Sequence, residues 1–319
     1  MPFVSIVTPC FNEEDNVRDL HHQIAQLFAA LPEYTYEHLY IDNASTDRTP
    51  EILRELAGSD PRVKVILNAR NFGHIRSPFY GMLQAAGEAV VIMASDLQDP
   101  PALIPTFLEK WRAGSKIVAA VKRESRDSLG LGLARKAFYR LIGTISDARL
   151  IPNFTGFGLY DRQVIEVLRQ IDDPYPYFRG LISEIGFTPA IVPFDKPARR
   201  RGITSNNFFT LYDLAMLGIT KHSVAPIRLA TLAGFLMSGA SLLIAVGYLV
   251  AKLVFWSRFS LGTAPMLIGM FFFSSVQLFF IGVLGEYIAS IHTQVRGLPL
   301  VVESERLNFE EPPAGAKTG

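Results

Sequence analysis

The sequence of 319 residues has a single cysteine, Cys10, and almost no net charge. One cysteine excludes an intrachain disulfide and a cysteine-rich zinc site, and it is typical of a reducing compartment. Lysine and arginine together number 31 against 30 aspartates and glutamates, which leaves a net charge of +1. Because there is no basic excess, we expect no nucleic-acid partner.

Glycine-rich phosphate-binding loops are also missing. Neither G-x-G-x-x-G nor G-x-x-x-x-G-K-[ST] follows any of the strands predicted below. Carboxylates that hold a divalent cation are the alternative way to bind a nucleotide's diphosphate. The six histidines show no metal-ligand spacing, so oxygen ligands are the ones to consider, and these suit Mg²⁺ or Mn²⁺.

Two long apolar runs are present in the C-terminal third. Leu229 to Phe255 carries one charge, Lys252, and Ala264 to Ser290 carries one, Glu286. Each run is long enough to cross a hydrocarbon core about 30 Å thick as a tilted helix. Two buried helices of a soluble core are the weaker explanation, because core helices rarely run this long without a polar face. The runs predict a transmembrane hairpin over residues 227–291.

The charges that flank these runs predict the orientation of the hairpin. Basic residues precede the first run and follow the second, whereas the loop between them has only Arg258 beside Lys252. By the positive-inside rule both ends are then cytoplasmic. The N-terminus reaches acidic residues after too few apolar ones for a secretory signal. We therefore expect a multi-pass protein of the inner (plasma) membrane, with a cytoplasmic domain over residues 1–205 and a cytoplasmic tail over 292–319.

Residues 206–226 join the predicted domain to the hairpin. This segment follows three arginines, at 199–201, and mixes aromatic and aliphatic side chains with polar ones. The pattern favours an amphipathic juxtamembrane helix that lies among lipid headgroups. A helix packed on the N-terminal domain is the alternative, because the amphipathic pattern is incomplete.

The N-terminal region alternates short apolar runs with helical patterns. The pattern predicts strands at residues 4–8, 38–41, 63–67, 89–94 and 117–121, and helices at 14–30, 48–56, 75–86, 102–111 and 131–146. Short apolar strands between helices indicate an α/β fold with a mostly parallel sheet covered on both faces. Ligands of such sheets bind beyond the carboxyl ends of the strands.

Three loops at the predicted carboxyl ends are rich in acidic and amide side chains. They read "PCFNEEDN", "DNASTDRT" and "SDLQDPP". Aspartate, asparagine and proline are also ordinary turn and capping residues, and Ser45 or Thr46 could cap the helix that follows. Three such loops at one edge favour a binding site. Asp96 and Gln98 occupy alternate positions and would point two oxygens the same way if that segment is extended.

Five segments of this sequence, in order, resemble family 2 glycosyltransferases. They are "SIVTPCFNEEDNV", "YIDNASTDRTPEIL", "RNFGHIRSP", "ASDLQDPPALIPTF" and, after the apolar runs, "GEYIASIHTQVRGLPL". More narrowly, they resemble the membrane-anchored polyprenyl-phosphate glycosyltransferases, relatives of dolichol-phosphate mannose synthase. The resemblance implies a GT-A (Rossmann-like) catalytic domain followed by an interfacial helix and two transmembrane helices. It also implies a homo-oligomer, a tetramer.

The implied reaction is transfer of a sugar, with inversion, from a UDP- or GDP-linked nucleotide sugar to polyprenyl (undecaprenyl) phosphate for cell-surface glycan or lipid modification. By position, the implied donor-binding residues are Pro9, Phe11, Glu13, Asp42, Asn43, Arg70 and Asn71. Asp96 is the implied catalytic residue, and Asp96 with Gln98 would hold Mg²⁺ or Mn²⁺.

Two departures from the family pattern concern the chemistry. Ala94 stands where the usual Asp-x-Asp metal motif has its first carboxylate, so one metal ligand is missing, and Asp99 could compensate. The segment "TGFGL" lacks an aspartate proposed as a base in relatives, and the next carboxylate is Asp161. No general base is therefore assigned.

A phosphate acceptor has little need of a base, because a phosphomonoester with a second pKa of about 6 is mostly dianionic at neutral pH. It needs positive charge instead. The densest basic stretch supplies Lys122, Arg123, Arg126 and Arg135, with Arg200 further along the chain. A solvated helical face would show the same pattern. The alternatives for function are transfer to another lipid acceptor, or a non-catalytic membrane partner that binds nucleotide sugars.

Overall fold

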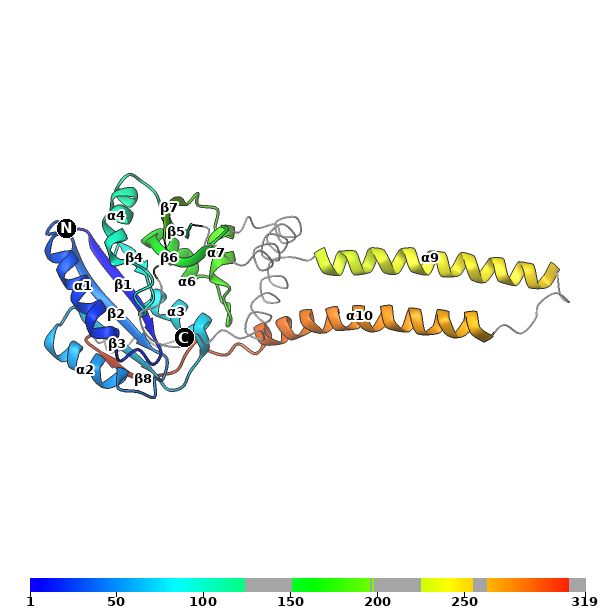
Figure 1. Ribbon diagram of the computed structural model, residues 1–319, viewed down its shortest axis with the longest axis horizontal. Helices are drawn as coiled ribbons and strands as arrows, with labels where there is room; N and C mark the ends of the chain where they lie inside the picture. Colours follow the sequence, from blue (N-terminus) through cyan, green and yellow to red (C-terminus); the bar gives the residue numbers. More distant parts are fainter. Residues whose placement is uncertain (124–150, 196, 198–224, 255–262, 310–319) are drawn as a thin grey trace. The chain divides into compact units, whose positions relative to one another are not determined.

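The computed structural model describes residues 1–123, 151–195, 197, 225–254 and 263–309 (Figure 1). These residues belong to two units. One is an α/β domain that includes both the N-terminal region and the residues from Arg296 onward, and the other contains two long helices. The predicted helix at 131–146 and the predicted juxtamembrane helix up to residue 224 lie outside the described residues.

The first part of the domain alternates strands and helices as the sequence predicts. Its elements are β1 (Phe3–Cys10), α1 (Val17–Ala29), β2 (Thr35–Asp42), α2 (Thr49–Ser59), β3 (Val63–Asn68), α3 (Gly73–Gln84), β4 (Ala89–Ile92), a 3₁₀ turn η1 (Pro101–Leu103), α4 (Ile104–Arg112) and β5 (Ile117–Lys122). The later elements are β6 (Phe154–Asp161), α6 (Arg162–Arg169), α7 (Phe178–Glu184), β7 (Ala190–Phe194) and β8 (Glu303–Leu307).

The described strands form one sheet of eight, in the order β7-β5-β6-β4-β1-β2-β3-β8. Strand β1 lies parallel to both β2 and β4, and β2 lies parallel to β3. Strand β6 runs antiparallel to β4 and β5, and β8 runs antiparallel to β3. The prediction of an α/β fold with a mostly parallel sheet is confirmed. Strands β6, β7 and β8 were not predicted.

Helices cover both faces of this sheet (Figure 1). On α1 the buried side chains are Val17, Leu20, Ile24 and Phe28, a spacing of three or four residues that places them on one helical face. The core beneath α1 and α4 joins β1, β4, β5 and β6, and a second core beneath α3, α6 and α7 fills the other face. Burial on both faces explains why the central strands read as continuous apolar runs.

Strand β8 shows that the segment after the predicted hairpin is part of the domain. It pairs with β3 through Val65 and Leu67, and Arg54 on α2 makes a two-pronged ion pair with Glu305. The side chain of Asn308 donates to the carbonyl oxygens of residues 57 and 63 at 2.7 and 2.9 Å. The predicted cytoplasmic tail, residues 292–319, therefore contains a strand that completes the sheet.

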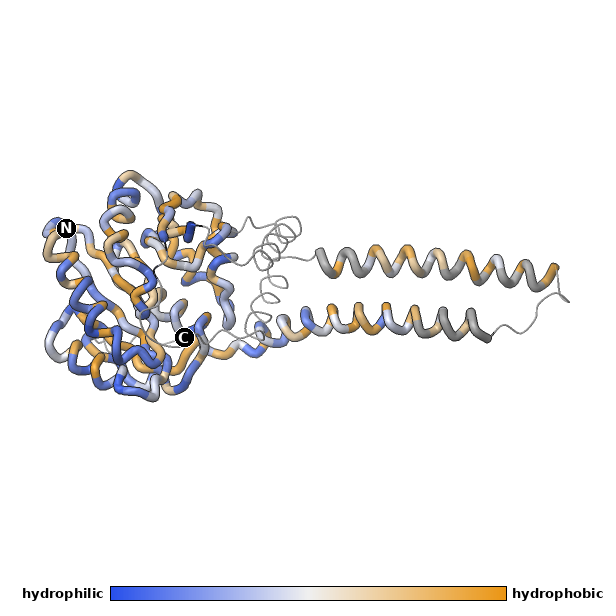
Figure 2. The backbone as a smooth tube through the Cα atoms, in the orientation of Figure 1, coloured by the Kyte–Doolittle hydropathy of each residue, from blue (hydrophilic) through white to orange (hydrophobic). Residues whose placement is uncertain are grey.

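The second unit contains α9 (Ala225–Val254) and α10 (Thr263–Val295). Figure 2 shows the coloured parts of both helices as mostly apolar, and large side chains such as Phe235, Leu243 and Met266 are about three-quarters exposed. Among the residues that the structure describes in full, one helical segment, Phe272–Val295, is long and apolar enough to cross a membrane. The predicted pair of spans is thus supported for α10, and the span in α9 stays a prediction.

Candidate active site

The carboxyl ends of the parallel strands meet at one edge of the sheet. Strands β1, β2 and β3 end there at Cys10, Asp42 and Asn68, and β4 ends there at Ile92. Strand β6 runs the other way, so it begins at the same edge. All three polar loops singled out in the sequence therefore lie at this carboxyl edge, which we take as the candidate active site.

The loops after β1 and β2 are held together by side-chain hydrogen bonds. The backbone N–H of Asn12 donates to Ser45 Oγ at 2.8 Å, and the N–H of Thr46 donates to Asn12 Oδ1 at 2.8 Å. Asn12 has φ 56°, in the left-handed region that asparagine tolerates. The expectation that Ser45 or Thr46 caps α2 is wrong. The N-cap residue is Arg48, which makes no side-chain cap hydrogen bond, and Asp47 accepts from the N–H of Thr49 at 3.0 Å.

Asp42 ends β2 as an almost fully buried carboxylate. It is 1% exposed, and its oxygens accept hydrogen bonds from the N–H and the hydroxyl of Ser45. Burial raises the pKa of Asp42, against the hydrogen bonds from Ser45, which lower it. The Asp42 carboxylate therefore fixes Ser45 and the loop after β2 at the carboxyl edge.

Cys10 faces Asp42 across the β1–β2 pair and is buried. Burial raises the pKa of its thiol well above the ordinary value, and the charges of Asp42 and Glu13 raise it further. A thiol in this environment stays protonated and is a poor nucleophile.

The other implied donor residues of this loop differ in exposure. Phe11 is 45% exposed and leaves an aromatic face open to a ligand, whereas Glu13 is 8% exposed. The carboxylate of Glu13 accepts from Asn16 Nδ2 at 2.6 Å, and its backbone N–H donates to Thr49 Oγ1. Glu13 thus connects the start of α1 to α2, while Phe11 beside Pro9 is the accessible member.

Asn43 uses its whole amide to hold the β3–α3 loop. Its Oδ1 accepts from the N–H of Phe72 at 2.8 Å and from Asn68 Nδ2 at 3.2 Å. Its Nδ2 donates to Asn71 Oδ1 at 2.9 Å and to the carbonyl oxygen of Gly73 at 3.3 Å. Asn43 is 7% exposed, so these four contacts account for its side chain. The structure thus gives Asn43 a positioning role within the site.

The loop that carries the proposed metal ligands is a turn. Leu97 has φ 58°, and the N–H of Gln98 donates to Asp96 Oδ1 at 3.1 Å. The expectation that this segment is extended is therefore wrong. Gln98 Nε2 donates to the carbonyl oxygen of Pro197, and Asp99, buried at 6% exposure, accepts from the N–H of Ala94. Asp99 thus closes the turn, and Asp96 and Gln98 remain the two residues for a cation.

The two oxygen ligands of Asp96 and Gln98 cannot complete the coordination shell of a metal ion by themselves. Within the described residues no group of three His, Cys, Asp or Glu side chains is placed to hold a metal ion. Mg²⁺ usually binds proteins through one or two carboxylates and completes its shell with substrate phosphates and water. The oxygens of Asp96 and Gln98 fit that mode, in which the donor's diphosphate supplies the remaining ligands.

The segment "TGFGL" forms the start of β6 at this edge. Gly156 has φ 103°, which an L-residue rarely adopts, and a Cβ at Gly158 would lie 2.2 Å from the carbonyl oxygen of Val118. Neither position can accept a carboxylate without a rearrangement of the backbone. Asp161 lies at the opposite edge, where it caps α6 and accepts from Trp111 Nε1 at 2.7 Å. It cannot serve as a base for chemistry at the carboxyl edge.

The predicted acceptor-binding cations are only partly described. Lys122 ends β5 at the carboxyl edge, and the guanidinium of Arg123 pairs with Asp195 at 3.1 Å, with both side chains mostly exposed. Exposed pairs of this kind are weak, so a phosphate could displace Asp195. Arg126, Arg135 and Arg200 lie outside the described residues.

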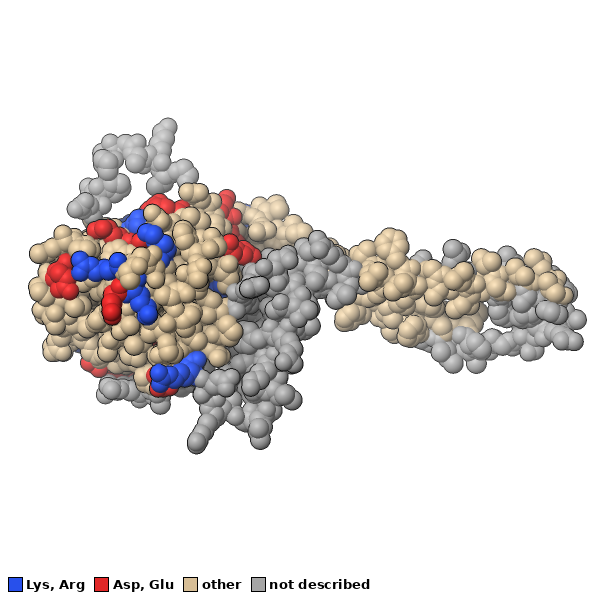
Figure 3. Space-filling view, turned by 90° about the horizontal axis from the view of Figure 1, so that it is seen from above, with Lys and Arg blue, Asp and Glu red and all other residues tan. Residues whose placement is uncertain are grey.

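The last implied donor residue, Arg70, stacks over the ring of Phe72 with its guanidinium carbon 4.2 Å from the ring centroid. On the face drawn in Figure 3, described lysines and arginines lie beside aspartates and glutamates. Asn68, Phe72 and Pro197 escaped sequence reasoning, because their roles depend on backbone groups that meet only in the fold.

Comparison with known proteins assigns a family. Residues 5–169 match the family model "Glycosyl transferase family 2". The chain is 36% identical to the uncharacterized glycosyltransferase YkcC of Bacillus subtilis over 96% of this chain and 94% of that protein. It is 35% identical to the SfII prophage-derived bactoprenol glucosyl transferase of Shigella flexneri, over 96% of this chain and 99% of that protein.

A solved structure, the mannosyltransferase PcManGT of Pyrobaculum calidifontis in complex with GDP-Man and Mn²⁺, is 18% identical with a TM-score of 0.47 and coverages of 92% and 87%. The family model and the two relatives cover the carboxyl-edge loops described above, and the relatives extend through both long helices. The chain belongs to glycosyl transferase family 2.

Proposed function

We propose that this chain transfers a sugar from a UDP- or GDP-linked nucleotide sugar to a polyprenyl phosphate at the cytoplasmic face of the membrane, with inversion. The observation that carries the proposal is the assembly of Phe11, Asp42 and the Asp96–Gln98 turn at one sheet edge, in a chain that continues into an apolar helix. The printed name of the Shigella relative, a bactoprenol glucosyl transferase, supports a polyprenyl acceptor.

The donor's nucleoside would bind beside β1 and β2. The exposed ring of Phe11 can stack on the base, and Asp42 can accept a hydrogen bond from the base edge. The fixed loops around Asn12 and Asn43 hold these groups before the donor arrives, which lowers the entropy cost of binding. We include the GT-A assignment of the domain in this proposal.

The donor's diphosphate would lie toward the β4 end of the site. Asp96 and Gln98 would hold Mg²⁺ or Mn²⁺, which neutralises charge on the departing nucleoside diphosphate. The chain's own contribution is to fix these two oxygens, because the Asp96–Asp99 turn is tied down by the N–H of Ala94 and by Pro197. This arrangement favours departure of the diphosphate without reorganisation of the protein.

The acceptor chemistry follows from the absence of a carboxylate at the start of β6. An oxygen of the acceptor's phosphate attacks the anomeric carbon, a new carbon–oxygen bond forms, and the bond to the nucleoside diphosphate breaks with its electron pair. The phosphate is already mostly dianionic at neutral pH, so no side chain has to remove a proton. Lys122 and Arg123, with Arg126, Arg135 and Arg200, are the proposed cations that receive it.

Membrane topology is supported by the position of β8. A strand can pair with β3 only on the side of the membrane where β3 lies, so the chain must cross an even number of times between β7 and β8. The segment Phe272–Val295 cannot then be a lone crossing. We propose α9 as the second crossing, which makes a multi-pass protein with the domain and β8 in the cytoplasm. A tetramer stays a prediction.

A test of the proposal uses purified full-length protein in detergent with undecaprenyl phosphate, Mg²⁺ or Mn²⁺, and a panel of UDP- and GDP-sugars. We expect one donor to release its nucleoside diphosphate only when lipid and metal are both present. Asp96→Asn should slow this release at least about 100-fold, the usual cost of losing one group that stabilises developing charge. The matched control is Glu33→Gln, an exposed carboxylate in the α1–β2 connection at the opposite edge. Release of nucleoside diphosphate at the same rate without lipid, or at the same rate in Asp96→Asn, would contradict the proposal.

A further inference from the structure

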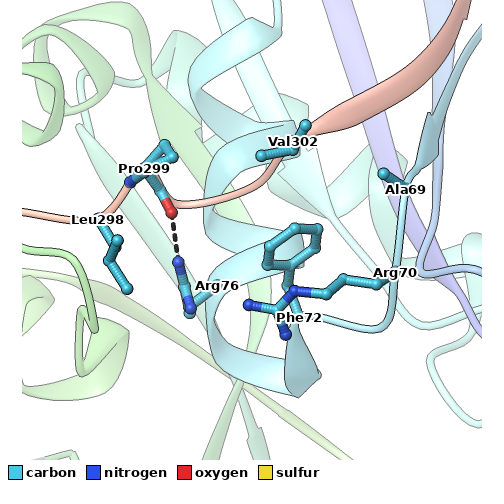
Figure 4. Close-up of a pocket in the computed structure, with 7 residues that line it drawn as sticks. All are labelled: Ala69, Arg70, Phe72, Arg76, Leu298, Pro299 and Val302. Carbon is cyan, nitrogen blue, oxygen red and sulfur yellow. Dashed lines mark hydrogen bonds between the residues drawn. The ribbon is translucent and has the colours of Figure 1, made fainter.

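A cavity of about 330 Å³ lies beside the β3–α3 loop (Figure 4). It is lined by Ala69, Arg70, Phe72, Arg76, Leu298, Pro299 and Val302. Two segments more than 200 residues apart in the sequence therefore build its walls, and a backbone hydrogen bond of 2.8 Å from Ala69 to Val302 joins them. Its volume lies at the lower end of the range for small-ligand sites.

Two arginines face one aromatic ring in this cavity. The guanidinium carbon of Arg70 lies 4.2 Å from the centroid of Phe72, and that of Arg76 lies 5.4 Å from the same centroid. Figure 4 shows both side chains beside the ring, with Arg76 donating to the carbonyl oxygen of Pro299. The Nε of Arg76 is buried and has no hydrogen-bond partner.

Neither arginine pairs with a carboxylate among the described residues, although most other arginines of the domain do. Arg18, Arg54, Arg62, Arg162, Arg169 and Arg306 each form such a pair. Burial lowers the pKa of Arg76, and the positive charge of Arg70 lowers it further. Two neighbouring cations without a counter-charge are unfavourable by themselves, and an anion between them would relieve that cost.

The other walls of the cavity are apolar. Phe72, Leu298, Pro299 and Val302 contribute hydrocarbon surface. Leu298 is only three residues after Val295, the last residue of α10, so an extended chain keeps it within about 11 Å of the end of that helix. A membrane-spanning α10 would thus end only three residues before the wall of this cavity.

We propose that this cavity binds a phosphate group carried on a lipid, with Arg70 and Arg76 holding the phosphate and Leu298 and Val302 contacting the first part of the hydrocarbon chain. The inference relies on the membrane location in the proposed function. It assigns a lipid-phosphate site at the β3 end of the carboxyl edge, apart from the cations around Lys122 at the β5 end. The lipid can be an anionic phospholipid of the bilayer, or a polyprenyl phosphate acceptor held here before its phosphate moves to the cations around Lys122.

The test is a binding measurement on purified full-length protein in detergent, without nucleotide sugar. The probes are farnesyl phosphate, farnesol, inorganic phosphate and a short-chain phosphatidylglycerol. We expect farnesyl phosphate to bind at least tenfold more tightly than farnesol or inorganic phosphate. If phosphatidylglycerol binds about as tightly as farnesyl phosphate, the cavity is a general phospholipid site. If phosphatidylglycerol binds clearly more weakly, the cavity is specific for the polyprenyl phosphate acceptor.

The variant is Arg70→Gln with Arg76→Gln, which should weaken farnesyl phosphate binding at least tenfold. The single variant Arg70→Gln, at an exposed position, should weaken it several-fold even if the double variant does not fold. The matched control is Arg112→Gln, because Arg112 also lies over a ring, 5.5 Å from the centroid of Tyr34, at the end of α4 near the opposite edge. Equal binding by the wild type and Arg70→Gln would overturn the proposal.

This experiment separates the cavity from the reaction. Arginine-dependent binding of farnesyl phosphate without sugar transfer would refute the proposed function and leave the lipid-phosphate site standing. Sugar transfer with a lipid KM that is unchanged in Arg70→Gln, together with unchanged binding, would refute the site and leave the function standing.

Discussion

Asn43→Asp is the substitution that best separates a positioning role from direct donor contact. The new carboxylate keeps the size and one acceptor oxygen of the amide, but it replaces Nδ2 by an oxygen. That oxygen would face Asn71 Oδ1, 2.9 Å from the present nitrogen, and the carbonyl oxygen of Gly73 at 3.3 Å. Two hydrogen bonds become two repulsive contacts in a side chain that is 7% exposed.

The expected cost follows from these contacts. Losing two hydrogen bonds at about 1 kcal/mol each, with repulsion between the facing oxygens added, destabilises the loop by about 2–4 kcal/mol. We expect a lower Tm and a donor KM raised at least tenfold, because the Arg70–Gly73 loop loses its support. A protonated carboxyl group can donate to Asn71, so lowering the pH toward 6 should recover part of the donor affinity.

The assay compares donor KM and Tm for the wild type, Asn43→Asp and Asn43→Ala at pH 6 and pH 8. Asn43→Ala removes the amide without adding charge, so its defect should not depend on pH. A donor KM that falls in Asn43→Asp, with an unchanged Tm, would refute the positioning role and place the side chain against the donor.

Three further predictions concern the rest of the domain. Asp161→Asn should lower the free energy of unfolding by about 1–2 kcal/mol, or the Tm by several degrees, because it weakens the hydrogen bond from Trp111. The rate of sugar transfer per folded molecule should not change. A lower rate of transfer with an unchanged Tm would contradict this prediction. Burial lowers the pKa of His38 well below its usual value, so thermal stability should be full above about pH 6.5 and fall as the pH drops below it, with a shallower fall in His38→Gln. Glu305→Gln should change the Tm by only a degree or two, because it breaks an exposed ion pair with Arg54. Deletion of residues 303–309 should lower the Tm by more than 10 °C, because it removes β8 from the sheet. Equal effects of the two changes would mean that β8 does not stabilise the sheet.

The sequence predicts the central fold because strands that are buried on both faces appear as continuous apolar runs. Strands β1 to β5 are apolar runs, and the structure places each of them within a few residues of its predicted position. Strand β8 reads "ESERL", with no apolar pattern, because it forms the edge of the sheet and gains its place from backbone pairing and ion pairs. Strand β6 contains two glycines, and the low strand propensity of glycine favours a loop at these positions. One of them, Gly158, is required by the close contact with β5.

The site is predictable at the level of loops and not of side-chain roles. The strand order places the three polar loops at one edge of the sheet. The alternation of strands and helices in the sequence predicts this placement. The left-handed conformation of Leu97 and the four contacts of Asn43 depend on backbone groups that sequence cannot locate. The cavity beside Arg70 was missed for the same reason, since its second wall comes from the segment after α10.

The central claim is that the acceptor is a phosphate on a polyprenyl chain, and that it reacts without a protein base. The most direct measurement offers purified protein undecaprenyl phosphate and undecaprenol as matched acceptors, with the active donor and metal, and identifies the lipid product by mass spectrometry. The account predicts a glycosylated undecaprenyl phosphate and no product from undecaprenol. Transfer to the alcohol at a comparable rate would contradict it, because a hydroxyl acceptor requires the base that the start of β6 does not provide.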